Sequence, residues 1–319
     1  MQTREFFTRP NNNERYGLIL GFLAIVGFSV TLPATRLAVS YIDPTLVGPG
    51  RALLAAIVSL TLLYGFKIPL PTARQWLSIS IVMFGVVIAF PWLTSIAMQD
   101  ISGAQGGIIV SMIPLFTAIA GALLLRQRPS MGFWFMAILG SALLLIYLLL
   151  SHSSGDTQGV HIQKSELILL TASILCAAGY AQGGKLAHQM GGIAVISWAL
   201  VLSIPFSIFA IIYTWTDKSA AELLHSPWQA WASLAYISLV SQLLAFIFWY
   251  RGLALGGVIR VSQVQLLQPF MTLLVSAVLL NETITLLMMI FATAVVITVA
   301  ISRKMPIHPA PRFKKKNSL

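Results

Sequence analysis

The sequence predicts an all-α membrane protein in which ten transmembrane helices form two inverted five-helix repeats. Only 9% of the 319 residues are charged, whereas 57% are hydrophobic and the mean hydropathy is +0.85. Soluble chains carry about 25% charged residues, so this chain has too little charge to cover a water-facing surface. About 20 apolar residues of helix cross a bilayer. The length therefore accommodates roughly ten spans with short loops and leaves no room for a separate soluble domain.

Each predicted span is an apolar run between turn or charge signals. The first follows a polar, basic segment, residues 1–16, and lacks a small-residue cleavage site, so we expect it to stay in the protein. The longest polar connection, 151–165, reads as a linker between the halves 17–150 and 166–302, and a basic tail, 303–319, follows. The predicted spans are 17–36, 44–66, 75–97, 101–125, 131–150, 166–187, 191–215, 228–250, 258–280 and 284–302.

Positive charge is distributed unevenly between the two sides of this topology. Arg51 and Arg260 lie within spans, and Arg36, Lys164 and Lys218 lie in loops after odd-numbered spans. All other Lys and Arg residues lie in the termini or in the loops after even-numbered spans. The positive-inside rule then places both termini in the cytoplasm, which predicts a multi-pass protein of the bacterial inner membrane. The membrane topology accounts for the net charge of +11, so nucleic-acid binding is not needed to explain it. The basic tail is expected to contact anionic lipid headgroups.

Two short matches suggest an internal duplication. MIPLFTAIAGALLLRQRPS from Met112 aligns with LQPFMTLLVSAVLLNETIT from Leu267, so that Pro114 falls on Pro269. Likewise ATRLA at 34–38 aligns with GGKLA at 183–187 and places Arg36 on Lys185. Duplication of five spans, an odd number, makes the second copy start on the opposite side of the membrane. Inverted repeats are a recurring plan of secondary transporters, whose substrate site lies near the midplane between the halves.

The second half carries three distinctive strings: WYRGLAL at the end of span eight, LLQP in span nine and the turn LNETIT. Residues 234–285, which contain them, strongly resemble the second repeat of the EamA family in the drug/metabolite transporter superfamily. In the first half, SIAMQDISGAQGGII resembles the end of span three and the start of span four, and Arg51 matches the family's Arg in span two. The resemblance implies ten helices in two inverted EamA-type repeats, and export or exchange of small metabolites.

The first repeat departs from the family pattern at two places. Val26 replaces the Trp of a Trp-Gly pair, although Gly27 is kept, and Gln127-Arg128 replaces the usual Glu-Arg after span four. We therefore assign no family role to these positions.

Polar groups within spans are costly in hydrocarbon and usually face a bundle interior or a water-filled cavity. Arg51 lies about two turns into span two. In a functional role it attracts a substrate carboxylate; in a structural role it snorkels to the outer headgroups or pairs with a carbonyl. The glutamines of span nine form either the wall of a wet cavity or interhelical hydrogen bonds. Trp92 belongs to the cavity or to an interface belt. The expected substrate-binding residues are Gln105, Tyr180, Gln265, Gln268, Arg51, Gln263, Gln182 and Trp92.

Several other kinds of chemistry are not expected. Cys176 is the single cysteine and cannot form an intrachain disulfide, the histidines are too dispersed for a metal cluster, and there is no phosphate-binding loop for ATP. Asp43, Asp100 and Glu282 lie near span ends and no acid lies deep in a span, so coupling through a buried carboxylate is not expected. We expect no catalytic residue, no metal and no cofactor.

The sequence leads to the hypothesis of a secondary transporter, an exporter or exchanger of small polar or amphipathic metabolites such as amino acids, that works by alternating access. A carrier of phosphorylated or nucleotide-linked sugars is the first alternative. A membrane-embedded transferase is the second, but it would need clustered His, Asp or Glu at one membrane face. The expected partners are a small-molecule substrate and membrane lipids. Substrate identity, direction, coupling and oligomeric state stay open.

Overall fold

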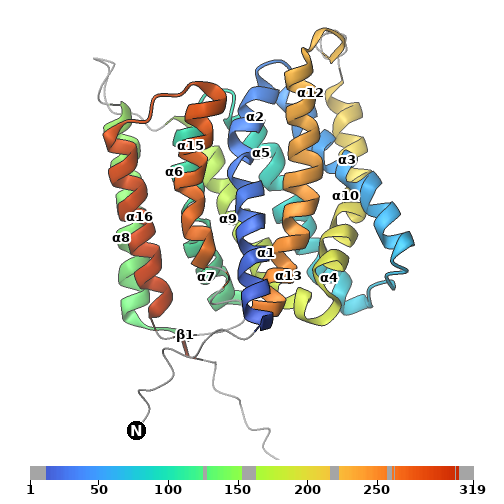
Figure 1. Ribbon diagram of the computed structural model, residues 1–319, viewed down its shortest axis with the longest axis horizontal. Coiled ribbons are helices and arrows are strands. Elements are labelled where there is room, and N and C mark those ends of the chain that lie inside the picture. The colour runs from blue at the N-terminus through green and yellow to red at the C-terminus, as the bar shows by residue number, and fades with distance from the viewer. Residues whose placement is uncertain are drawn as a thin grey trace, which may run out of the picture.

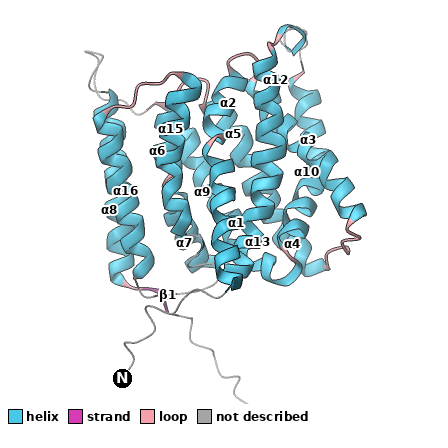
Figure 2. Cartoon of the chain, viewed as in Figure 1, coloured by secondary structure: helices cyan, strands magenta, loops and turns pink. Residues whose placement is uncertain are grey.

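A computed structural model of the chain describes residues 12–124, 128–152, 163–215, 223–256, 261, 263–305 and 307–308. Their regular secondary structure is helical apart from a two-residue antiparallel pairing of β1 (Arg128–Pro129) with β2 (Ile307–His308). Figures 1 and 2 show the helices running side by side in one bundle. The predicted terminal segments and the linker at 151–165 lie largely outside the described residues.

Most helices start and end close to the predicted limits. For example, the run predicted at 44–66 is helical over Pro44–Gly65, and the run predicted at 191–215 is helical over Gly192–Thr214. The helices of the first half are α1 (Asn12–Ser29), α2 (Thr31–Val39), α3 (Pro44–Gly65), α4 (Ala73–Val82), the π-helix η1 (Met83–Ala89), α5 (Phe90–Ala97), α6 (Gly103–Val110), α7 (Ile113–Leu124) and α8 (Met131–His152). Those of the second half are α9 (Lys164–Met190), α10 (Gly192–Thr214), α12 (Trp228–Ala235), the π-helix η2 (Tyr236–Leu244), α13 (Ala245–Gly256), the 3₁₀ helix η3 (Gln263–Leu267), α15 (Gln268–Leu280) and α16 (Leu286–Lys304).

Seven helical segments among the described residues are long and apolar enough to cross a membrane. They are Arg15–Val39, Pro44–Gly65, Ala73–Ala97, Gly103–Gly121, Lys164–Met190, Gly192–Thr214 and Trp228–Gly256. Three further apolar helices are shorter: Met131–Leu144, Val264–Leu280 and Leu286–Ile301. The chain is therefore a multi-pass membrane protein, as the composition predicted.

Proline marks two of the places where the helical path is interrupted. Pro114 is the second residue of α7, which follows a break after α6, and Pro269 is the second residue of α15, which follows η3. A proline has no N–H to donate, but the first turn of a helix needs none, so proline is well tolerated there. The sequence predicts paired kinks at these two residues, and the structure places each of them in the first turn of a helix that follows an interruption.

The helices pack in a few dominant pairs. α3 packs on α10, α1 on α13, α8 on α16, and α6 on α15, while α9 contacts α4, η1, α5 and α7. In Figure 1, α8 and α16 form one edge of the bundle, whereas α3 and α10 lie toward the opposite edge. The contact between η1 and α9 depends on glycine, because a Cβ added at Gly179 would lie 2.6 Å from the Cγ2 atom of Val86.

The two ends of the bundle are named the upper end and the lower end, as they lie in Figure 1. The upper end contains α2, the start of α6 and the start of α12, and the lower end contains the start of α1, α4 and the end of α13.

Candidate functional site

Arg51 is the only lysine or arginine that is buried among the described residues. It lies about two turns into α3, a helix capped where the Thr45 backbone N–H donates to Asp43 Oδ1 at 2.7 Å. Its side chain is 1% exposed, so it does not snorkel to the outer headgroups. Burying a cation costs several kcal/mol unless it is paired. A buried arginine in a membrane helix is accordingly typical of a functional site.

The guanidinium of Arg51 is only partly satisfied by its neighbours. Nη2 donates to Ser241 Oγ at 3.4 Å, and the hydroxyls of Ser241 and Thr31 share a hydrogen bond of 2.7 Å. Nε and Nη1 have no hydrogen-bond partner among the described residues. A guanidinium carries five N–H donors, so this one can still bind an acceptor such as a carboxylate.

Two π-helical segments meet beside this arginine. Gln242, next to Ser241 in η2, is fully buried, and its Nε2 donates to the carbonyl oxygen of Val86 in η1 at 3.3 Å. The Gln242 Oε1 atom has no partner in the described part of the chain. Single π-helical turns occur frequently at functional sites. We call Arg51, Thr31, Ser241 and Gln242 the Arg51 cluster.

Tyr180 extends the Arg51 cluster on the side of α9. The Tyr180 ring lies 5.7 Å from the ring of Phe246 and 6.5 Å from that of Trp249, measured between centroids. Tyr180 and Cys176, one turn apart on α9, are in electrostatic range of Arg51. The predicted residues Arg51 and Tyr180 therefore come together, although they lie in different halves of the chain.

Trp92 approaches the same region from α5. A Cβ added at Gly48 would lie 2.5 Å from the Trp92 Cα atom, so α5 lies directly against this part of α3. Gly48 is one turn before Arg51, and residues three apart share a helix face. The Trp92 Nε1 atom is buried without a partner among the described residues, so this residue of α5 also has an unused hydrogen-bond donor.

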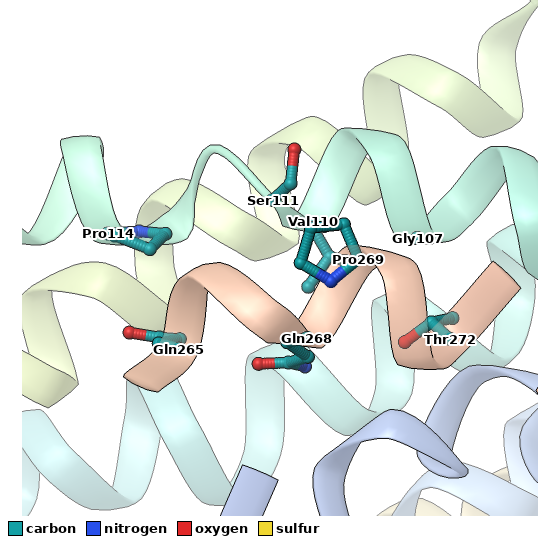
Figure 3. Close-up of a pocket in the computed structure, with 8 residues that line it drawn as sticks. All are labelled: Gly107, Val110, Ser111, Pro114, Gln265, Gln268, Pro269 and Thr272. Atoms are coloured by element: carbon teal, nitrogen blue, oxygen red, sulfur yellow. The ribbon is translucent and has the colours of Figure 1, made fainter. Parts of the chain in front are cut away.

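Gln265 and Gln268 line a small cavity that shares no residue with the Arg51 cluster (Figure 3). Its volume is about 10 Å³, enough for about one water molecule. The lining residues are Gly107, Val110, Ser111, Pro114, Gln265, Gln268, Pro269 and Thr272. The two prolines matched by the duplication thus flank one polar cavity, which in this conformation is too small for a metabolite. The backbone of Gln263 lies in η3, whereas its side chain and Arg260 lie outside the described residues.

Gln105 lies at the upper end, apart from the Arg51 cluster. Its Nε2 donates to Glu166 Oε1, and the Glu166 Oε2 atom accepts from the Gln163 backbone N–H at 3.0 Å. Glu166 is fully buried. Glu166 lies in the first turn of α9 and not deep in the span, but it is buried because α6 covers this end of the helix. Its span-end position in the sequence does not reveal this burial.

Further contacts close the upper end. Arg36 Nη1 donates to the carbonyl oxygen of Met98 at 2.5 Å and to that of Gln99. Ser165 Oγ donates to Asp100 Oδ2. Glu282, in the turn between α15 and α16, accepts from the backbone N–H groups of Gly103 and Ala104 at 2.8 Å each. We call the set Arg36, Asp100, Gln105, Ser165, Glu166 and Glu282 the upper-end network.

Gln182 lines a groove at the lower end. The groove has a volume of about 570 Å³ and lies between α4 and the last turns of α9. Although Gln182 is only two residues from Tyr180, residues two apart on a helix point in different directions. The structure thus divides the seven predicted residues whose side chains it describes among four places. Arg51, Tyr180 and Trp92 belong to one region, Gln265 and Gln268 line the small cavity, and Gln105 and Gln182 lie at opposite ends of the bundle.

Sequence reasoning missed Thr31, Ser241, Gln242 and Glu166. Ser241 and Gln242 are adjacent polar residues within an apolar run. The same pattern singled out the glutamines at 263–268, so it could also have identified Ser241 and Gln242. The sequence signal at Thr31 is weaker, since single threonines are common in membrane helices. In the part of the chain that the structure describes, no group of three His, Cys, Asp or Glu residues is placed to hold a metal ion.

The chain was compared with known proteins. The EamA-like transporter family profile matches residues 15–149 and 163–303. Over 297 residues the chain is 39% identical to "Uncharacterized transporter YdeK" of Bacillus subtilis (strain 168), a match that covers 92% of this chain and 99% of that protein. Over 277 residues it is 24% identical to "Probable amino-acid metabolite efflux pump" of Salmonella typhimurium, covering 83% of this chain and 87% of the relative.

A solved crystal structure shares the fold. Its TM-score against this chain is 0.62 at 16% sequence identity, over 91% of this chain and 96% of that chain. The family profile matches both halves of the sequence, and the Bacillus relative aligns over nearly its full length. As the strings WYRGLAL, LLQP and LNETIT predicted, this chain belongs to the EamA-like transporter family.

Proposed function

We propose that this protein is a secondary transporter of the inner membrane that exports or exchanges small carboxylate-bearing metabolites, such as amino acids, by alternating access. One observation carries the proposal: the Arg51 guanidinium is 1% exposed and keeps two nitrogens without partners among the described residues. A carboxylate accepts two parallel N–H bonds from a guanidinium. Substrate binding would therefore supply the counter-charge that this buried cation lacks.

The surroundings of Arg51 favour a zwitterion. The unpartnered Gln242 Oε1 atom, next in sequence to the Ser241 that Arg51 contacts, can accept a hydrogen bond from a substrate ammonium group. The ring of Tyr180 can bind the same cation through its π face. Phe246 and Trp249, which pack on Tyr180, offer apolar surface to a side chain. The name of the Salmonella relative, an efflux pump for amino-acid metabolites, supports this substrate class and outward transport.

The membrane architecture in this proposal is ten helices in two inverted repeats, residues 17–150 and 166–302. The three shorter apolar helices would supply the spans beyond the seven long ones. If each span is matched with its counterpart in the other half, three packed pairs map onto themselves: α3 with α10, the α6–α7 span with the η3–α15 span, and α8 with α16. The packing of α1 on α13 likewise maps onto that of α9 on α5. A pseudo-two-fold axis produces this exchange.

The direction of the helices also supports inverted repeats. In Figure 1, α4 lies near the lower end and α5 near the upper end, whereas their counterparts α12 and α13 run from the upper end to the lower end. The distribution of Lys and Arg favours a cytoplasmic lower end, with both termini in the cytoplasm. In an alternating-access cycle the upper-end network would close the outer side of the protein.

A carrier of phosphorylated sugars has less support. A phosphate dianion would call for at least two deep cations, and the described residues supply only Arg51. Lys185, considered as a second cation, is exposed in the lower groove, and Arg260 lies outside the described residues.

The test is counterflow in proteoliposomes loaded with an unlabelled amino acid, with a panel of labelled amino acids supplied outside. Arg51→Gln should lower the initial exchange rate at least about tenfold, because a hydrogen bond to a charged group contributes about 1.5–3 kcal/mol and each 1.4 kcal/mol is tenfold. Arg51→Lys should retain part of the rate, since lysine keeps the charge but lacks the planar fork.

Gln265→Leu and Gln268→Leu provide the comparison. Their cavity holds about one water molecule, so we expect a smaller reduction in exchange than for Arg51→Gln. Expression and folding of each variant are checked by size-exclusion chromatography. If a correctly folded Arg51→Gln protein exchanged amino acids at the wild-type rate, Arg51 would not bind the substrate and the proposal would fail.

A further inference from the structure

The lower groove is separate from the Arg51 cluster and differs from it in chemistry. Its volume of about 570 Å³ lies within the usual range of roughly 300–1,000 Å³ for small-molecule pockets. Most of its lining can form hydrogen bonds, and the described lining includes no acidic side chain. The lining residues are Thr72, Arg74, Gln75, Leu77, Ser78, Gln182, Lys185, Leu186 and Gln189.

Two positively charged side chains line this groove, one from each wall. Arg74 comes from the first turn of α4 and Lys185 from the last turns of α9. Both side chains are exposed, and neither has a hydrogen bond or an ion pair within the described ranges. Facing cations without a nearby acid repel each other, so a bound anion would relieve this repulsion.

Local hydrogen bonding adds donors to the same groove. The Oε1 atom of Gln75 already accepts from the Thr72 backbone N–H at 2.8 Å, so the part of this side chain that stays free is its NH₂ group, a double donor. The groove also contains the start of α4, where the helix dipole favours negative charge. The groove therefore presents donors and positive charge from both of its walls.

Exposed apolar side chains lie beside the groove on both of its walls. Leu77 in its wall is 71% exposed, and Phe84, about two turns further along the same path, is 55% exposed. On α9, Ile174 is 49% exposed, and Lys185 follows it by eleven residues, about three helical turns. Both walls of the groove thus continue an exposed apolar stripe toward the end of the bundle, which is where a phospholipid headgroup would lie.

We propose that this groove binds the phosphate of an anionic phospholipid headgroup. The phosphate would lie between Arg74 and Lys185, with the glycerol beside Leu77 and Leu186. The acyl chains would follow the apolar stripes that carry Phe84 and Ile174. This assignment is independent of which substrate the Arg51 cluster binds, since the two sites share no residue. It gives Gln182 a place in a lipid site rather than in the transport cavity.

Native mass spectrometry of the purified full-length protein tests the proposal with phosphatidylglycerol and phosphatidylcholine as probes. The wild type should retain phosphatidylglycerol in preference to phosphatidylcholine. Arg74→Gln/Lys185→Gln should weaken retention of phosphatidylglycerol at least about tenfold, because two charge-assisted contacts are lost. The matched control, Arg15→Gln/Arg251→Gln, removes two exposed cations elsewhere in the lower half and should leave retention unchanged. Unchanged retention in Arg74→Gln/Lys185→Gln would overturn the proposal.

A second measurement separates a lipid from a soluble anion. In nanodiscs, an amine-acetylating reagent should modify Lys185 more slowly when the bilayer contains phosphatidylglycerol than when it is pure phosphatidylcholine. Lys164, exposed at the upper end, serves as the internal reference. If inorganic phosphate protected Lys185 in pure phosphatidylcholine while phosphatidylglycerol gave no protection, the groove would bind a soluble anion, and the lipid assignment would be wrong.

Discussion

Arg36 and Lys185 occupy matching positions in the two halves of the sequence, yet they have different surroundings. Arg36, at the upper end, donates to the carbonyl oxygen of Met98 at 2.5 Å and to that of Gln99. Lys185, at the lower end, is exposed and without a hydrogen-bond partner in the described part of the chain. The position shared by the two halves is thus hydrogen-bonded at the upper end of the bundle and carries an exposed charge at the lower end.

The difference extends beyond one pair of residues. The upper-end network joins α2, α6, α9 and the turn after α15 through charged and polar side chains. Around Lys185 there is a groove of about 570 Å³ instead. Substitutions in the upper-end network should accordingly lower stability, whereas the same kind of change in the groove should not.

The largest effect is expected for Gln105→Leu. This change removes the amide that donates to the fully buried carboxylate of Glu166, and a hydrogen bond to a charged group contributes about 1.5–3 kcal/mol. We expect a loss of about 2 kcal/mol in the free energy of unfolding, measured by thermal unfolding in detergent. Gln99→Leu, at an exposed side chain of the same end, is the control and should change stability by less than about 0.5 kcal/mol. Equal unfolding midpoints for the two variants would contradict the role given to Gln105.

A smaller effect is expected for Glu282→Ala. The carboxylate accepts from the first two backbone N–H groups of α6, and removal of a helix-capping acceptor costs about 0.5–2 kcal/mol. Hydrogen exchange read by mass spectrometry should accelerate in the peptide that contains Gly103 and Ala104. The peptide covering α4, at the other end, should keep its wild-type rate and serves as the control. Wild-type protection of the start of α6 would show that Glu282 does not hold it.

The smallest effects test the Arg36–Lys185 comparison directly. Arg36→Gln should destabilise the protein by about 1 kcal/mol, because two backbone carbonyls lose their donor. Lys185→Gln should stay within about 0.5 kcal/mol of the wild type, as expected for an exposed side chain without partners. Both values come from the same thermal unfolding series. A larger loss of unfolding free energy for Lys185→Gln than for Arg36→Gln would contradict the structural role given to Arg36.

Local features of the sequence were sufficient for much of the fold. Low charge and long apolar runs identified a helical membrane protein, and the segments Pro44–Gly65 and Gly192–Thr214 match their predicted limits closely. Pro114 and Pro269 marked the points where α7 and α15 begin. These features are local, because burial of backbone polar groups in lipid enforces helices whatever their neighbours are. The family resemblance is also local, because it rests on the short sequence strings WYRGLAL, LLQP and LNETIT.

Contacts between distant residues needed the folded chain. Arg51 meets Ser241 across 190 residues, and Gln105 meets Glu166 across 61. Helical spacing tells which side of a helix a residue occupies, but it does not tell which other helix that side faces. For this reason the sequence selected Arg51, Gln105 and Gln182 as one group, whereas packing places them in a buried polar cluster, in the upper-end network and in the lower groove.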